Sequence, residues 1–234
     1  MSFNRFKKRK SKFNSLIKHL FFGEGLQDRK IISGRAKGIH LYIDPAFNFQ
    51  RITGTYEYEV QALFVDFAKK TDCFLDLGAG DGYYSLLYKK YNPVKEVYLF
   101  DADKDLEQLQ KKHFALNNIP GGFHSYFKTL ADENAEQHIL MVSPPLGNNK
   151  TLIKIDVEGA ELLALKALSA LLKENECWLI IETHSAQLEK DCIDFLTKHK
   201  YHTRVIKNAW WRSILPERRP LEHNRWLAGW KVNN

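Results

Sequence analysis

The sequence predicts an α/β fold: a doubly wound, Rossmann-like and mostly parallel sheet with helices on both faces and an antiparallel hairpin at its C-terminal edge. Three observations support this prediction. Short apolar segments typical of buried strands alternate with helical patterns, as right-handed crossovers between parallel strands require. The first of these strands leads into a glycine-rich loop. The last two strand-like segments follow one another without a helix, which favours an antiparallel pair at the sheet edge.

The elements before the glycine loop are a strand and a helix. Alternating apolar and polar residues over 37–45 predict a lead-in strand that Pro45 ends. A helix is expected over residues 56–69, with Thr55 as its cap and acidic residues in its first turn. Its buried stripe should consist of Val60, Leu63, Phe64 and Phe67.

From the glycine loop onward, strands and helices alternate. The predicted strands are "CFLDL" (73–77), "VYLF" (97–100), "LIKID" (152–156) and "CWLIIE" (177–182). The predicted helices cover residues 83–91, 103–117, 158–173 and 186–199. The closing pair is "TRVI" and "RWLAGWKV", in which Trp226 and Trp230 are expected to pack in the core. These elements make one domain over residues 46–234.

The formal charge of +7 is concentrated in one segment. The chain has 35 Lys and Arg against 28 Asp and Glu, and residues 1–19 hold seven of the basic residues and no acidic one. The remainder is formally neutral. We expect residues 1–45 to form a basic amphipathic arm and the lead-in strand, with the arm binding an anionic membrane surface or another polyanion, or packing on its own domain.

The compartment follows from cysteine usage and from hydropathy. The chain has three cysteines without C-x-x-C spacing, which argues against a disulfide framework and favours a reducing environment. Charged residues interrupt every apolar run before it reaches the length of a signal peptide or a membrane span. We expect a cytoplasmic protein, which the arm could hold at a membrane surface.

The glycine loop predicts a nucleoside cofactor. Missing side chains let backbone N–H groups and a helix start approach a ligand, and Asp101 at the end of the next strand can accept hydrogen bonds from both ribose hydroxyls. The alternative for Asp101 is a helix N-terminal acid. The expected cofactor-binding residues are Asp76, Gly78, Ala79, Gly80, Gly82, Asp101, Ala102 and Asp156.

The spacing of the loop favours one cofactor class. Dinucleotide sites prefer G-x-G-x-x-G, whereas this chain has G-x-G-x-G with Asp76 two residues before the first glycine. A carboxylate there would repel a pyrophosphate but attract the ammonium and sulfonium groups of S-adenosylmethionine. S-adenosylmethionine is therefore the expected cofactor.

At this point the chain resembles the class I S-adenosylmethionine-dependent methyltransferases. The segments "LIKIDVEGAELLAL" and "LIIETH", with "GTYEYE" at residues 54–59, are similar to the FkbM-like branch over roughly residues 50–185. The resemblance implies a cytoplasmic O-methyltransferase acting on hydroxyls of sugars or other natural-product precursors. Residues 121–150 depart from that branch, because "ILMVSPPLGNN" replaces its short strand and Leu-Asp pair.

Four strand-end residues suggest the chemistry. Methyl transfer to an alcohol requires alignment and removal of a proton, and Asp156, Glu158, Glu182 and His184 should converge near the methyl group. We expect His184 to be the general base, with Asp156 or Glu182 orienting it or binding the acceptor. Glu158 and Glu161 are equally explained as helix N-terminal acids. Carboxylates and a histidine can also gather around a hard cation, so a metal site stays open here, although nothing in the spacing demands one. The residues expected to bind the acceptor are Glu57, Glu158, Trp210, Trp211 and Arg212.

Three functions remain open at this point. A methyltransferase acting on a hydroxyl of a small-molecule, sugar or glycan acceptor is favoured. An RNA-modifying methyltransferase guided by the basic arm is second, although the neutral body and the leucine in "SPPL" (143–146), where base-methylating enzymes have an aromatic residue, count against it. A non-catalytic nucleoside-binding module is third.

Overall fold

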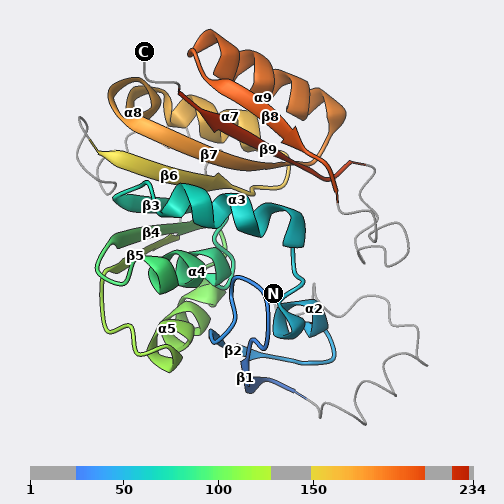
Figure 1. Cartoon of the computed structure of the whole chain (residues 1–234), viewed down its shortest axis with the longest axis vertical. Helices are drawn as coiled ribbons and strands as arrows, with labels where there is room; N and C mark the ends of the chain where they lie inside the picture. Colours follow the sequence, from blue (N-terminus) through green and yellow to red (C-terminus); the bar gives the residue numbers. More distant parts are fainter. Residues whose placement is uncertain (1–24, 128–148, 209–222, 232–234) are drawn as a thin grey trace.

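The computed structural model describes residues 25–127, 149–208 and 223–231. Within them a seven-stranded sheet has the order β5-β4-β3-β6-β7-β9-β8 (Figure 1). Its strands are β3 (Cys73–Leu77), β4 (Glu96–Asp101), β5 (Phe123–Phe127), β6 (Lys150–Ile155), β7 (Glu176–Thr183), β8 (His202–Ile206) and β9 (Arg225–Trp230). The pairs from β5 to β7 are parallel, whereas β9 is antiparallel to both β7 and β8. The predicted doubly wound sheet with an antiparallel edge hairpin is confirmed.

The strand order reverses at β3. The chain runs from β3 outward through β4 to β5, and then returns to place β6 on the other side of β3. In such sheets, ligands bind beyond the carboxyl ends of the strands where the order reverses. The candidate site is therefore expected at the ends of β3, β4, β6 and β7.

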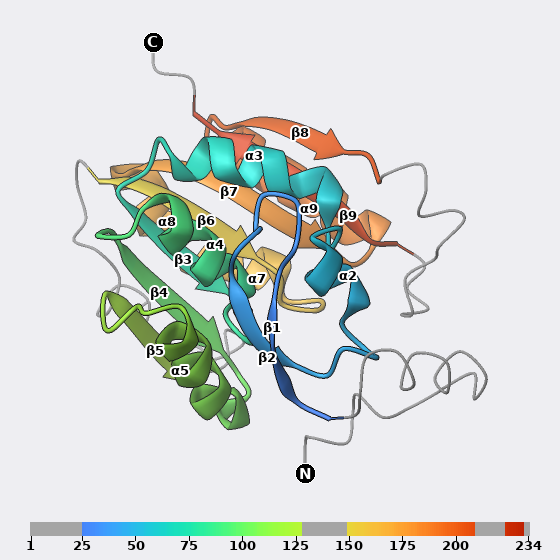
Figure 2. The same ribbon diagram turned by 60° about the horizontal axis from the view of Figure 1, so that its bottom comes forward.

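Helices cover both faces of the sheet (Figures 1 and 2). One face packs against α3 (Tyr58–Ala68), α4 (Tyr83–Tyr91) and α5 (Glu107–Leu116), where Phe64, Phe74 and Phe114 are fully buried. The other face packs against α7 (Glu161–Ala167), α8 (Ser169–Glu174) and α9 (Ala186–Lys198), with Leu75, Leu171 and Leu196 in the core. Alternate residues of β3 enter the two cores, as the two-residue period of a strand dictates.

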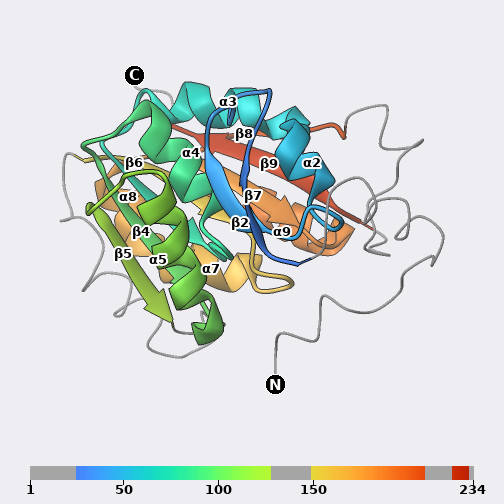
Figure 3. The ribbon, with the colours of Figure 1, turned by 90° about the horizontal axis from the view of Figure 1, so that it is seen from below.

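The lead-in strand lies outside the main sheet. Strand β2 (His40–Ile43) pairs with β1 (Gln27–Lys30) in a separate antiparallel sheet, and β1 was not predicted. Figure 3 shows this hairpin beside α4 and α5. The Asn117 side chain at the end of α5 bonds both the N–H and the carbonyl of His40, each at 2.8 Å.

Several predicted boundaries were wrong. Helix α3 begins after Glu57, which has φ +47° and no side-chain cap, while the Thr55 hydroxyl bonds Thr53 instead of capping. The helix predicted over 158–173 is two helices, α7 and α8, that meet at Leu168. The segment 103–117 starts as a 3-10 turn (Lys104–Leu106) before α5. Helix α2 (Phe49–Thr53) and strand β5 were not predicted.

The C-terminal hairpin is positioned as expected. Trp226 on β9 is fully buried, and Trp230 is partly buried with its ring centroid 6.2 Å from that of Phe67. Trp210, Trp211, Arg212 and the "SPPL" segment lie outside the described residues. Among the helices that are described, none combines the length and the apolar character needed to cross a membrane.

Candidate active site

The glycine loop after β3 is fixed by main-chain contacts. The N–H groups of Gly78 and Ala79 donate to the Phe100 carbonyl at 2.8 and 3.0 Å. Gly78 has φ +78°, and a Cβ there would lie 1.9 Å from the carbonyl oxygen of Asp156. Only glycine permits this close approach, so the loop is packed directly on the chain that leaves β6.

The next glycine faces open space. Gly80 has φ +54°, and a Cβ built on it would meet no heavy atom within 4 Å. Its N–H donates to Oδ2 of Asp101 at 2.8 Å, while Asp101 Oδ1 accepts from the N–H of Asp103 at 2.9 Å. A carboxylate has about four acceptor positions, so Asp101 can still accept bonds from two ribose hydroxyls. Ala102 beside it is exposed.

We expect Asp101→Ala to weaken S-adenosylmethionine binding by about 1–3 kcal/mol, because charge-assisted hydrogen bonds to the ribose are lost. Calorimetric titration measures the change. Asp103→Ala is the matched control, since Asp103 caps the following 3-10 turn by accepting from the N–H of Asp105. Equal affinities in wild type and Asp101→Ala would remove Asp101 from the cofactor site.

Asp76 lies buried beneath the loop. Its Oδ2 accepts from the Ser85 hydroxyl at 2.9 Å, and its Oδ1 lies 3.7 Å from Nζ of Lys154. Burial raises the pKa of Asp76 to about 6, against the lowering effect of Lys154 and Ser85. The direct contact with the cofactor that we expected for Asp76 stays a prediction.

Lys154 is the cation at the centre of the site, and sequence analysis missed it. Its side chain is 4% exposed, and Nζ lies 3.3 Å from Asp156 Oδ2, 3.4 Å from the Gly78 carbonyl and 5.2 Å from the centroid of the Tyr84 ring. Burial alone would lower its pKa, but Asp156 and Asp76 raise it above the usual value. A charged residue inside the apolar strand "LIKID" was the available signal.

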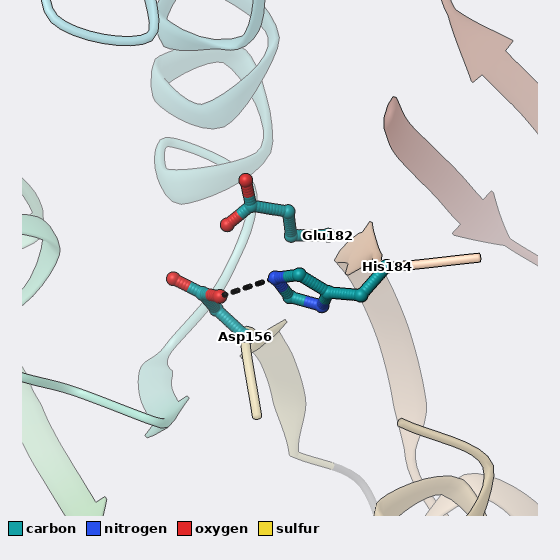
Figure 4. Close-up of side chains that lie close together, drawn as sticks. All are labelled: Asp156, Glu182 and His184. Atoms are coloured by element: carbon teal, nitrogen blue, oxygen red, sulfur yellow. Dashed lines mark ion pairs between the residues drawn. The ribbon is translucent and has the colours of Figure 1, made fainter. Parts of the chain in front are cut away.

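Asp156, Glu182 and His184 lie together, as predicted from their strand ends (Figure 4). Asp156 directly follows β6. Glu182 is the penultimate residue of β7, and His184 directly follows that strand. The Nε2 atom of His184 is 3.7 Å from Asp156 Oδ1, which is too long for a hydrogen bond. The side chain of Asp156 is 19% exposed and that of His184 only 6%, so Asp156 is the more accessible of the two.

Glu182 differs from the other two in charge. Burial and the nearby carboxylates of Asp156 and Glu57 raise the pKa of Glu182 to about 10. At neutral pH it is therefore a neutral acid, able to donate a hydrogen bond but unable to act as a base. Its Oε2 is buried and makes no hydrogen bond to a described residue.

His184 is held from its other side. Its Nδ1 bonds Oε1 of Glu161 on α7, and Glu161 is fully buried. Burial lowers the pKa of His184, but Glu161 and Asp156 together raise it above the ordinary value of 6.5. Sequence analysis left Glu161 between a helix acid and a catalytic role, and it did not predict the pair with His184, which joins residues 23 positions apart.

Of the other residues that we expected to bind the acceptor, one lies beside the cluster and one is exposed to solvent. Glu57 is buried and accepts from the Tyr84 hydroxyl at 2.6 Å, which places it beside the Lys154 network. Glu158 is exposed in the turn before α7. A further pair was not predicted: Arg51 on α2 forms an ion pair with Asp81 of the glycine loop and lies 4.7 Å from the centroid of Tyr56.

The cluster has the spacing of a cation site. One ligand atom from each of Asp156, Glu182 and His184 lies within 4.8 Å of the others. Lys154 already compensates the charge of Asp156 at 3.3 Å, and the carboxyl group of Glu182 is neutral at physiological pH. These features favour proton transfer over cation binding, and the absence of a metal from the site stays a prediction.

S-adenosylmethionine fits the residues present. Among the described residues, a Cβ built on Gly80 meets no heavy atom within 4 Å, and Asp101 borders this space. Two carboxylates, Asp76 and Asp156, flank the one charge of Lys154 at the ends of β3 and β6, which suits a ligand carrying a sulfonium and an ammonium.

Comparison with solved structures shows the same fold. The precorrin-6y C5,15-methyltransferase of Geobacter metallireducens aligns with a TM-score of 0.51 and 14% identity over 75% of this chain and 88% of its own. An S-adenosylmethionine-dependent O-methyltransferase from Thermotoga maritima aligns with a TM-score of 0.54 and 10% identity, over 85% and 75%. An rRNA methylase from Streptococcus thermophilus aligns with a TM-score of 0.50 and 13% identity, over 73% and 95%.

Sequence comparison identifies the family. A search of curated proteins finds no match. The methyltransferase small domain, in contrast, matches residues 58–208, which is well over half of the chain and includes every strand of the seven-stranded sheet except β9. This range contains the glycine loop, Asp101, Asp156 and His184. The chain therefore belongs to the methyltransferase small domain family, and its cofactor is S-adenosylmethionine.

Proposed function

We propose that the protein transfers the methyl group of S-adenosylmethionine to a hydroxyl of a small-molecule, sugar or glycan acceptor, as in the FkbM-like branch that its sequence resembles. The observation that carries this proposal is the Nε2 of His184, which makes no hydrogen bond to any described residue and lies 3.7 Å from Asp156 Oδ1 beside the cofactor loop. A base is needed for an alcohol, whose proton must leave as the new bond to carbon forms.

In this proposal His184 takes the proton. Asp156, the most exposed member of the cluster, accepts a hydrogen bond from the acceptor hydroxyl and holds its oxygen near Nε2. The cofactor supplies the methyl group. As the acceptor oxygen gains the methyl group, its proton passes to Nε2, and Glu161 and Asp156 stabilise the resulting imidazolium. Glu182, neutral at this pH, can donate a hydrogen bond to the same oxygen or to Asp156.

The direct test is methyl transfer from isotopically labelled S-adenosylmethionine to a panel of monosaccharides, glycans and phenols, followed by mass spectrometry of the product. We expect an ether linkage on a hydroxyl oxygen. A product methylated only on nitrogen or carbon would contradict the O-methylation proposal while leaving the family unchanged.

Turnover should survive removal of divalent cations. With the Nε2 of His184 acting as a base, prior treatment with EDTA is expected to leave the rate unchanged, because no step needs a Lewis acid. The measurement compares the treated enzyme with and without added Mg²⁺ or Mn²⁺. Loss of activity that either ion restores would show that the cluster of Asp156, Glu182 and His184 binds a cation instead.

RNA methylation is the second candidate, because the excess positive charge lies in residues 1–19 and one structural neighbour is described as an rRNA methylase. The salt dependence of acceptor binding distinguishes RNA methylation from methylation of a neutral small molecule or glycan. RNA binding should weaken steeply as salt rises, whereas binding of a neutral acceptor should be nearly independent of salt.

Deletion of residues 1–19 should remove binding to anionic liposomes and other polyanions but leave cofactor affinity unchanged, because the rest of the chain is formally neutral. Co-sedimentation with vesicles containing phosphatidylserine measures the first effect, and neutral vesicles are the control. If the truncated protein still sediments with anionic vesicles, the arm is not the contact.

We further propose a cytoplasmic location, with membrane contact through the arm. The thiols of Cys73, Cys177 and Cys192 are all free and buried, which agrees with a reducing compartment.

A further inference from the structure

We infer that Glu161 is a positioning residue for the proposed general base: it fixes the proton of His184 on Nδ1 and so directs the Nε2 lone pair at the acceptor. This inference rests on the proposed function. Glu161 does not border the acceptor itself, because its carboxylate is fully buried on the far side of the imidazole.

With Glu161 ionised, the geometry allows one arrangement of the proton on a neutral imidazole. An ionised carboxylate only accepts hydrogen bonds, so the contact between Glu161 Oε1 and His184 Nδ1 requires the proton to be on Nδ1. The neutral imidazole then has its lone pair on Nε2. That atom is buried, has no hydrogen-bond partner among the described residues, and faces Asp156. This is the arrangement in which a carboxylate orients a catalytic histidine.

Glu161 is itself held in place. Its Oε1 also accepts from the N–H of Gly159 at 3.1 Å, in the turn between Asp156 and α7. The same short turn therefore carries Asp156 at one end and the partner of His184 at the other. Cys192 on α9 also lies near Glu161. Burial raises the pKa of the Cys192 thiol, and the negative charge of Glu161 raises it further.

A stabilising role for Glu161 in its helix does not explain its position. The helix dipole favours an acid in the first turn at exposed and at partly buried positions alike, so this role does not require complete burial. The carboxylate of Glu161 nevertheless has no exposure, and its buried Oε2 has no hydrogen-bond partner in the part of the chain that the structure describes. Burying an unpaired carboxylate oxygen costs free energy, and such exceptions concentrate at functional sites.

The tautomer of His184 is measurable in the unmodified protein. Long-range ¹H–¹⁵N correlation spectra distinguish a protonated from an unprotonated ring nitrogen, and the signals of His184 are identified by their loss in His184→Ala. At a pH where the ring is neutral, we expect the proton on Nδ1. A neutral ring protonated on Nε2 would overturn the inference, whatever the result of any activity assay.

Glu161→Gln provides the second test. The charged groups that act on His184 are Asp156 after β6, Glu158 before α7 and Glu161 on α7. Without the Glu161 charge, the NMR titration midpoint of His184 should fall by about one pH unit. Turnover should fall roughly 10- to 100-fold, with the acid limb of its pH profile shifted by the same amount. Glu161→Asp, which keeps the charge, should restore part of both.

Glu189→Gln is the matched control. Glu189 is another buried carboxylate, paired with Arg225 and with His223, and it has no described contact with the cluster. It should leave the His184 midpoint unchanged. An unshifted midpoint in folded Glu161→Gln contradicts the inference. A shifted midpoint together with failure of every hydroxyl acceptor would instead contradict the proposed function and leave the pairing intact.

Discussion

Replacing His184 with alanine is expected to lower methyl transfer by about 10²- to 10⁴-fold, the usual contribution of a general base. Cofactor affinity should be nearly unchanged, since Gly80 and Asp101 lie at the ends of β3 and β4 and His184 lies after β7. The measurement pairs initial rates with calorimetric titration of S-adenosylmethionine. Asp156→Asn should also lower turnover, with a small effect on cofactor binding.

The pH profile gives this prediction a second readout. Because Glu161 and Asp156 raise the pKa of His184, its basic form appears only above the ordinary value of 6.5. Turnover should therefore rise with pH through a midpoint above 6.5, and this limb should disappear in His184→Ala. His124→Ala is the control, because His124 is exposed and bonds Glu96 at 2.9 Å. If His184→Ala keeps full turnover and the same limb, Asp156 becomes the better candidate for the base.

Gly78→Ala should destabilise the protein and abolish cofactor binding. The new Cβ would lie 1.9 Å from the Asp156 carbonyl oxygen, so the glycine loop and the end of β6 would have to separate. We expect the free energy of unfolding to fall by more than about 3 kcal/mol, beyond the roughly 1–2 kcal/mol that a positive φ alone costs a non-glycine residue. Denaturant unfolding measures this loss.

Alanine substitutions at two other glycines distinguish the cost of a positive φ from the cost of a steric clash. Gly38 has φ +95° with nothing within 4 Å of a built Cβ, so Gly38→Ala should show the conformational cost alone. Gly80 has the same open space but borders Asp101, so Gly80→Ala should remain folded yet bind S-adenosylmethionine more weakly. Equal losses of stability in Gly78→Ala and Gly38→Ala would mean that the loop does not pack on Asp156 as described.

The parts of the fold that follow from local pattern were predicted well. The strands β3, β6 and β7 are short apolar runs buried on both faces, and α9 has a clear amphipathic period. The break at Leu168 was missed because residues on either side continue an apolar helical pattern. Strand β5 was missed because its sequence "FHSYF" is only partly buried, at the edge of the sheet.

Some residues of the candidate site could likewise be predicted from local pattern, whereas others could not. Strand-end acids and the glycine loop could be placed from sequence, because parallel strands bring their carboxyl ends to one edge. The partners of those residues could not. Lys154 joins Asp76 to Asp156, Glu161 holds His184, and Arg51 pairs with Asp81. Each of these contacts depends on side-chain direction across separate elements, which residue spacing does not encode.

The central claim is that the cofactor loop and the cluster of Asp156, Glu182 and His184 form one active site. A crystal structure with S-adenosylhomocysteine bound tests it most directly. We expect the ribose hydroxyls on Asp101, the adenosine beside Gly80, and the sulfur directed toward Asp156 and His184 Nε2, with room between them for one acceptor oxygen. Density that places the sulfur away from this cluster, or the ribose away from Asp101, would contradict the account.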